Sequence, residues 1–151
     1  MILRRTLTTA AVLVTSAVSA VAVSGSAYAN TGPGYTEFCT QPFAKAGGAC
    51  FYSDNDSFKL TDNYADGLRS VLRWELGDRA KKGTPGYIIR RGECHNTLGA
   101  NKTIVCDYDF PEGKLNGTSR YLVHFKVESQ DGPSGRPVYY VGGPIGYVSG
   151  R

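Results

Sequence analysis

From about residue 49 onward, apolar and polar residues alternate in short runs, and this pattern predicts β-strands. The clearest run is at residues 121–128, because a period of two places successive side chains on opposite faces of a strand. One face of this predicted strand carries Tyr121, Val123, Phe125 and Val127. A turn-forming sequence at 131–135 and a second β-rich run at 138–141 follow, so these two strands are predicted to pair as a hairpin.

Residues 68–76 fit two periods. In a strand, one face carries Leu68, Ser70, Leu72, Trp74 and Leu76. In a helix, the apolar stripe consists of Leu68, Val71, Leu72 and Leu76. Because the segment is short and both ends are Asp/Gly turns, the strand is favoured. Trp74 then shares a face with leucines and is predicted to fill the core, the alternative being a platform for a sugar ring.

Further strand-like runs occur at 49–52, 58–61, 87–90 and 103–106. No long helical period with caps is present in the sequence. Short strands separated by Gly, Pro and Asn turns predict an all-β fold, a small disulfide-stapled antiparallel β-sandwich or barrel. Residues 30–48 show no period and are predicted to be an N-terminal arm, so residues 49–151 would form a single β domain.

The first 29 residues have the features of a secretory signal peptide. Arg4 and Arg5 precede an apolar run at 10–23, and Ala27-Tyr28-Ala29 is a small-x-small cleavage site. A membrane anchor is the alternative, but this run is short and contains Ser and Thr, whereas a spanning helix needs about 20 strongly apolar residues. We therefore expect a secreted, extracellular protein that begins at Asn30.

The chain has four cysteines, all of them after the predicted cleavage site. An even number in an oxidising compartment predicts two disulfides. Three connectivities are possible, and the similar short spacings favour Cys39–Cys50 and Cys94–Cys106. The turn-rich residues 95–101 suggest that the second disulfide staples a hairpin. A zinc site is disfavoured because it usually contains closely spaced Cys-x₂-Cys pairs.

The charge of the chain is weakly positive. The formal net charge is +4 from 17 basic and 13 acidic residues, and cleavage would remove Arg4 and Arg5, leaving 15 basic residues and a net charge of +2. Binding to nucleic acid needs a clustered basic face, so no nucleic-acid partner is predicted. No later segment is long and apolar enough to span a membrane. We expect a monomer without a cofactor.

Three spaced motifs resemble a class of small secreted actinobacterial proteins that have one β domain and an uncharacterised function. They are Asp62-x-x-Ala65-Asp66-Gly67-x-x-Ser70-Val71-x-x-x-Trp74, Gly92-x-Cys94-x-Asn96-x-x-Gly99 and Cys106-x-Tyr108-x-Phe110-x-Glu112-Gly113. The resemblance covers residues 58 to about 127. It implies a source and a fold class but no activity, and it assigns no catalytic residues.

An acidic segment suggests calcium, a cation that prefers oxygen ligands. Its members are Asp54, Asn55, Asp56, Asp62 and Asp66. An EF-hand loop that starts at Asp54 would need an oxygen ligand at its fifth position and glycine at its sixth, but Phe58 and Lys59 stand there. The residues are interpreted as turn formers, and no metal site is predicted.

Candidate catalytic groups are sparse. His95 and His124 are the only histidines, and the chain has no Gly-x-Ser-x-Gly nucleophile elbow. Oxidised cysteines cannot act as nucleophiles. Glu112 with Asp107 or Asp109 would supply the two carboxylates of a glycosidase, but 13 scattered acids offer many such pairs. No catalytic residue is assigned.

The polar segment Gly77–Gly86 is the strongest candidate for recognition. It contains Arg79, Lys81 and Lys82 and ends near Pro85, so it would present basic side chains to an acidic specificity pocket, as in inhibitors of trypsin-like proteases. A weaker candidate is a contact patch of Tyr139, Tyr140 and Tyr147. The sequence therefore favours a secreted binding domain for an extracellular protein or polysaccharide, either protease-inhibitor-like or surface-recognising. The alternatives are a small secreted hydrolase and a carbohydrate- or cell-wall-binding module.

Overall fold

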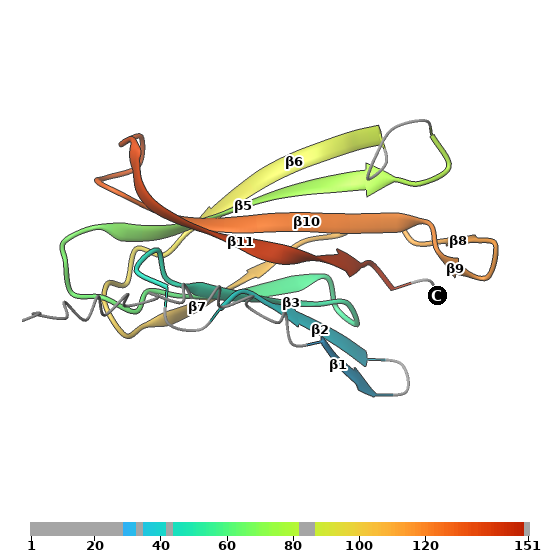
Figure 1. The fold of residues 1–151 in the computed structure, drawn as a ribbon, viewed down its shortest axis with the longest axis horizontal. Coiled ribbons are helices and arrows are strands. Elements are labelled where there is room, and N and C mark those ends of the chain that lie inside the picture. The colour runs from blue at the N-terminus through green and yellow to red at the C-terminus, as the bar shows by residue number, and fades with distance from the viewer. Residues whose placement is uncertain (1–28, 33–34, 42–43, 82–86, 150–151) are drawn as a thin grey trace, which may run out of the picture.

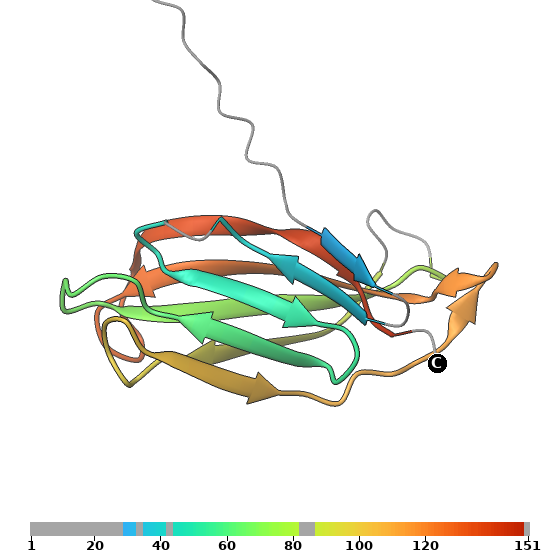
Figure 2. The same cartoon turned by 90° about the horizontal axis from the view of Figure 1, so that it is seen from below.

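The protein is a two-layer, all-β sandwich with antiparallel sheets (Figure 1), as the computed structural model shows for residues 29–32, 35–41, 44–81 and 87–149. The first sheet contains, in spatial order, β1 (Ala29–Gly32), β2 (Tyr35–Cys39), β3 (Gly48–Tyr52), β4 (Ser57–Thr61) and β7 (Thr103–Asp107). The second contains β11 (Pro137–Tyr147), β10 (Tyr121–Gln130), β5 (Arg69–Asp78) and β6 (Tyr87–His95). A short hairpin, β8 (Lys114–Leu115) and β9 (Thr118–Ser119), projects at one end (Figure 2). None of these ranges contains a helix that could cross a membrane.

The predicted alternation determines the core. On β10, Val123, Phe125 and Val127 are buried, while His124 and Lys126 are exposed. On β5, Leu72, Trp74 and Leu76 are buried on the same side, and the two inner faces of the sandwich meet in an aromatic cluster. Its rings belong to Phe51, Phe58, Trp74, Tyr108, Phe110 and Phe125. Aromatic pairs prefer the edge-to-face and offset arrangements that recur here, and they add to the stabilisation from burial.

Residues 68–76 form a strand rather than a helix, because β5 lies between β10 and β6 in the second sheet. Trp74 points into the core and only 2% of its surface is exposed. Its register neighbour on β6 is Gly92. A Cβ atom at Gly92 would lie only 2.3 Å from the indole, so the missing side chain makes room for the tryptophan.

The range predicted as an N-terminal arm contributes two strands to the first sheet. β1 pairs with β2, and β2 pairs with β3, so these two strands extend the sheet. Phe38 lies in the core, where its ring stacks on Phe51. The sequence of β2, Tyr-Thr-Glu-Phe-Cys, does not alternate between apolar and polar residues, and this explains why no period predicted the strand. The predicted signal peptide falls outside the described residues except for Ala29, the first residue of β1.

Both disulfides have the pairing that the spacing favours, but they perform different structural roles. Cys39 and Cys50 lie directly opposite each other on neighbouring strands of one sheet. Cys94 and Cys106 lie on β6 and β7, which are edge strands of different sheets. The second disulfide therefore links the two layers, and both bonds are typical of a protein from an oxidising compartment.

The hairpin predicted for residues 87–106 is wrong. β6 pairs with β5 and β7 pairs with β4, so residues 96–102 cross from one sheet to the other. Asn96 holds this crossing in place: its fully buried amide donates hydrogen bonds to the main-chain carbonyls of Leu60 (3.2 Å) and Lys102 (2.7 Å). Turn-forming residues indicate that the chain reverses, but they do not indicate which strand it joins next.

Candidate functional site

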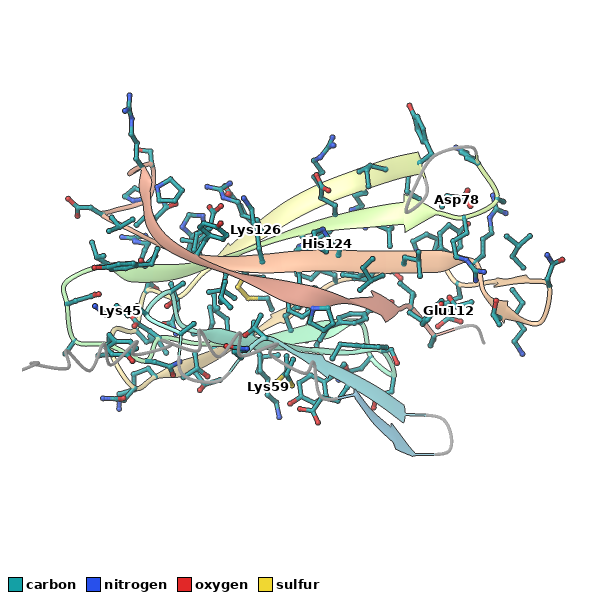
Figure 3. All side chains as sticks on the ribbon, viewed as in Figure 1. Lys45, Lys59, Asp78, Glu112, His124 and Lys126 are labelled. Carbon is teal, nitrogen blue, oxygen red and sulfur yellow. A yellow bond between two sulfur atoms is a disulfide. The ribbon has the colours of Figure 1, made fainter. Side chains whose placement is uncertain are left out.

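The outer face of the second sheet, which points away from the first sheet, carries a regular array of charged side chains. Because β10, β5 and β6 are antiparallel and in register, their outward residues form rows across the sheet. Two neighbouring rows are His124–Glu75–Arg91 and Lys126–Arg73–Glu93. His124 and Lys126 lie along β10 (Figure 3), which is one of the two inner strands of this sheet.

These rows line an open groove with a volume of about 690 Å³. We call it the charged groove, and its lining residues are Arg73, Trp74, Glu75, Arg91, Gly92, Glu93, His124, Phe125 and Lys126. Since Trp74 and Phe125 direct their rings into the core, the side chains that fill the groove are the six polar ones. Charged side chains thus border a groove whose exposed wall is largely apolar, on the back of the aromatic core.

Cross-strand ion pairs order the floor of the groove. Arg91 Nε donates to Glu75 Oε1 at 2.7 Å, and Arg73 Nη1 pairs with Glu93 Oε2. Both pairs join residues that are directly opposite each other on β5 and β6. Cross-strand pairs of opposite charge stabilise a sheet by only about 0.2–1 kcal/mol each, so their main effect here is to fix where the donors and acceptors point.

Glu128 on β10 is the most buried charge at the edge of the groove. Its two carboxylate oxygens accept from Arg73 Nε (2.7 Å) and Lys126 Nζ (2.5 Å). Burial alone would raise the pKa of Glu128, but the hydrogen bonds from Lys126 and Arg73 outweigh burial and hold this pKa below its ordinary value. Arg73 therefore bridges two carboxylates and connects β5 to both of its neighbours.

Both histidines lie near carboxylates of the groove. His124 lies opposite Glu75, and His95 Nε2 lies 3.5 Å from Glu93 Oε1. The described residues that line the groove include no serine, threonine or cysteine to act as a nucleophile.

The structure places the predicted recognition residues in different environments. Arg79 donates to Thr118 Oγ1 (2.7 Å) and to the main-chain carbonyl of Ser119 (2.6 Å), and its guanidinium lies over the ring of Tyr147. It is bound to the β8–β9 hairpin rather than presented. Lys81 Nζ lies over the ring of Tyr87, and Lys82 is outside the described residues.

Asp78, which precedes Arg79, also ties the start of this loop to the segment that follows β9. Asp78 is buried, and it accepts two hydrogen bonds from Arg120, at 2.8 and 2.7 Å. The hydrogen bonds from the Arg120 guanidinium hold the pKa of Asp78 below its ordinary value, against the effect of burial. The start of the predicted recognition loop is thus part of the folded structure.

The other candidate groups have structural roles. Asp56 has a φ of 53° in the turn after β3, and its carboxylate accepts from the main-chain N–H of Phe110 at 3.0 Å. The carboxylate of Glu112 accepts from Ser149 at 2.8 Å. In the described part of the chain, the only cluster with metal-ligand spacing is Glu37 with Cys39 and Cys50. Its two sulfur atoms form a disulfide, so they cannot bind a metal as thiolates.

The exposed tyrosines belong mainly to β11, an edge strand. Tyr139 has Lys45 over its ring and Tyr147 has Arg79. Tyr140 is the most exposed large apolar side chain among the described residues, at 78%, and it lies opposite Glu128 beside the charged groove. The predicted tyrosine patch is therefore divided, and only Tyr140 and Tyr147 share the outer face with the groove.

Sequence reasoning did not select the two Arg–Glu pairs of the charged groove. The signal was present: outward positions read Arg73-x-Glu75 on one strand and Arg91-x-Glu93 on the next. In antiparallel neighbours, these sequences place opposite charges face to face at the observed register.

The chain matches no known protein-family model, no curated protein and no solved structure. Its site residues are therefore inferred from geometry alone.

Proposed function

We propose that this protein is a secreted, extracellular binding domain that holds its ligand in the charged groove. The observation that carries the proposal is the network of ion pairs on the groove floor, in which Arg73 and Arg91 are fixed against glutamates before any ligand arrives. Side chains that are already ordered lose less entropy on association. The two disulfides support a location in an oxidising, extracellular environment.

A binding role agrees better with the geometry than the alternatives do. Inhibition of a trypsin-like protease would need a presented basic side chain. Arg79 is already bound by Thr118 and Ser119, while Lys81 is exposed with its ammonium over the ring of Tyr87. Hydrolysis would need a nucleophile or a protonated acid beside His124. Binding needs only an accessible, ordered polar surface, and Arg91 provides one with 68% of its side chain exposed.

The test is a binding panel with matched variants. The secreted chain is applied to immobilised neutral polysaccharides, anionic polysaccharides and trypsin-like serine proteases, and retention is measured by biolayer interferometry. Arg91→Ala removes one charge from the groove without disturbing the core. The control is Lys59→Ala on the outer face of the first sheet (Figure 3), where Lys59 Nζ lies 4.7 Å from the ring centroid of Tyr52.

We expect at least one ligand class to bind the wild-type chain and the Lys59→Ala control equally, and to bind the Arg91→Ala variant several-fold more weakly. Circular dichroism must show that both variants are folded. Binding that is equally strong in all three proteins would place the site elsewhere and overturn the proposal. Absence of binding to every member of the panel would also count against it.

A further inference from the structure

The charges around the groove cancel, and this restricts the chemistry of the ligand. The basic residues are Arg73, Arg91 and Lys126, and the acidic residues are Glu75, Glu93 and Glu128. The lining residues carry three positive and two negative groups, and Glu128 at the edge of the groove brings the formal charge of the array to zero. A polyanion would meet the glutamates and a polycation would meet the arginines, and like charges brought together cost free energy.

A neutral ligand rich in hydroxyl groups meets neither penalty. Each hydroxyl both donates and accepts a hydrogen bond, so it can bind to a guanidinium N–H on one side and to a carboxylate oxygen on the other. The alternation of Arg73 with Glu93 and of Glu75 with Arg91 offers both types of group at neighbouring positions. Hydrogen bonds to ionised groups are stronger than those between neutral groups, so the ion pairs are good partners for hydroxyls.

Tyr140 adds an apolar surface beside these polar rows. Several exposed tyrosines have their rings covered by cations: Tyr87 by Lys81, Tyr139 by Lys45 and Tyr147 by Arg79. In the described part of the chain, no cation–π or aromatic contact is made by the ring of Tyr140. The ring lies opposite Glu128, whose carboxylate is held by Lys126 and Arg73 of the next row. An uncovered aromatic face therefore lies next to an ordered array of donors and acceptors.

From these observations we infer that the charged groove binds a neutral polysaccharide chain, with one sugar ring stacked on Tyr140 and neighbouring hydroxyls bound by the Arg–Glu pairs. A sugar ring has C–H groups on its faces, which pack against the negative face of an aromatic ring, and hydroxyl groups around its edge. Tyr140 matches the C–H faces of such a ligand, and the Arg–Glu pairs match its hydroxyl groups. The inference rests on the proposed function and adds the class of ligand.

The experiment compares affinities by isothermal titration with soluble neutral glucan and chitin oligosaccharides, with an anionic uronic-acid oligosaccharide, and with a mixed-charge peptide. Tyr140→Ala should weaken binding to a neutral oligosaccharide about tenfold, because stacking and burial of one aromatic ring are lost. Tyr140→Phe keeps the ring and should stay within about twofold. Tyr87→Ala, at the other edge of the sheet, is the matched control and should equal the wild type.

The dependence of affinity on ionic strength and on the class of ligand distinguishes the neutral-polysaccharide inference from the proposed binding function. A neutral ligand should bind with nearly the same affinity at low and high ionic strength, because its attraction does not depend on long-range charge. If the uronic-acid oligosaccharide or the peptide binds instead, and Arg91→Ala removes that binding, the neutral-polysaccharide inference is overturned while the binding groove stands. If neutral oligosaccharides bind equally well to the wild type and to both the Tyr140→Ala and Arg91→Ala variants, both proposals fail.

Discussion

The two faces of the second sheet are built from the same strands and differ in almost every other respect. On the inner face, Trp74 and Phe125 lie directly opposite each other and are nearly fully buried. The next residue on each strand is charged and lies on the outer face: Lys126 is exposed and Glu75 is half-buried. The inner face resists change because each ring fills a fixed volume. On the outer face, each cross-strand ion pair contributes little to stability, and the binding function that we propose would account for their order.

The largest expected effect separates the two faces at adjacent residues. Phe125→Ala should lower the free energy of unfolding by about 3–5 kcal/mol, because it leaves a cavity in the aromatic cluster. Lys126→Ala should lower it by less than about 1 kcal/mol, since an exposed ion pair contributes little. Urea unfolding followed by tryptophan fluorescence measures both values. Similar losses at the two positions would mean that the faces do not have these separate roles.

A smaller loss of stability is expected from adding a side chain at Gly92, the glycine that packs against Trp74. Gly92→Ala should cost about 1–3 kcal/mol, because the new methyl group would overlap the buried indole of Trp74, and overpacking a core is destabilising. The same change at Gly77 is the control, since the nearest atoms to a Cβ there are 4.0 Å away. Thermal unfolding should show a lower Tm for Gly92→Ala alone. An unchanged Tm would mean that Trp74 is able to move away from its present position.

The inner face could be predicted from sequence far better than the outer one. Alternation identified Val123, Phe125 and Val127 as buried residues of β10, although Tyr121 is only half-buried and Leu122 and Glu128 on the other face are buried as well. The short spacings favoured the observed disulfide pairs. Periodicity assigns a residue to a face, but it does not say which strand lies beside it. For this reason the crossover at 96–102 was mistaken for a hairpin turn. The short strands β1 and β2 were missed because they contain too few residues to show a period.

The charged groove depends on strand pairing and register, which the alternation of apolar and polar residues does not reveal. Arg73 and Glu93 are 20 positions apart in sequence, and they become neighbours only at one register of β5 against β6. A shift by one residue would place every side chain of a strand on the other face. Arg79 shows the opposite case: its sequence context suggested presentation, but the β8–β9 hairpin binds it. Local composition could not reveal that partner.

The smallest expected effect tests whether the outer face is ordered by charge. Glu128→Gln keeps the shape of the side chain but removes the charge that Arg73 and Lys126 share. We expect a loss of about 0.5–1.5 kcal/mol at neutral pH, because charge-assisted hydrogen bonds become neutral ones and both partners remain partly exposed to water. Chemical unfolding of the two proteins over a range of pH measures the difference.

The sign of the pH dependence follows from the lowered pKa of Glu128, which the hydrogen bonds from Lys126 and Arg73 produce against the opposing effect of burial. Since the folded protein holds this proton less tightly than the unfolded chain, the ionised carboxylate stabilises the fold at pH values above the unfolded pKa. That contribution is lost as the pH falls through the lower, folded pKa. The wild type should therefore exceed Glu128→Gln in stability at neutral pH, and the difference should shrink in acid, below about pH 4. A difference that stayed constant from neutral to acidic pH would show that the amide fails for steric reasons and that charge does not hold Arg73 in place. In that case the ordered floor of the groove, on which the proposed binding function depends, would need another cause.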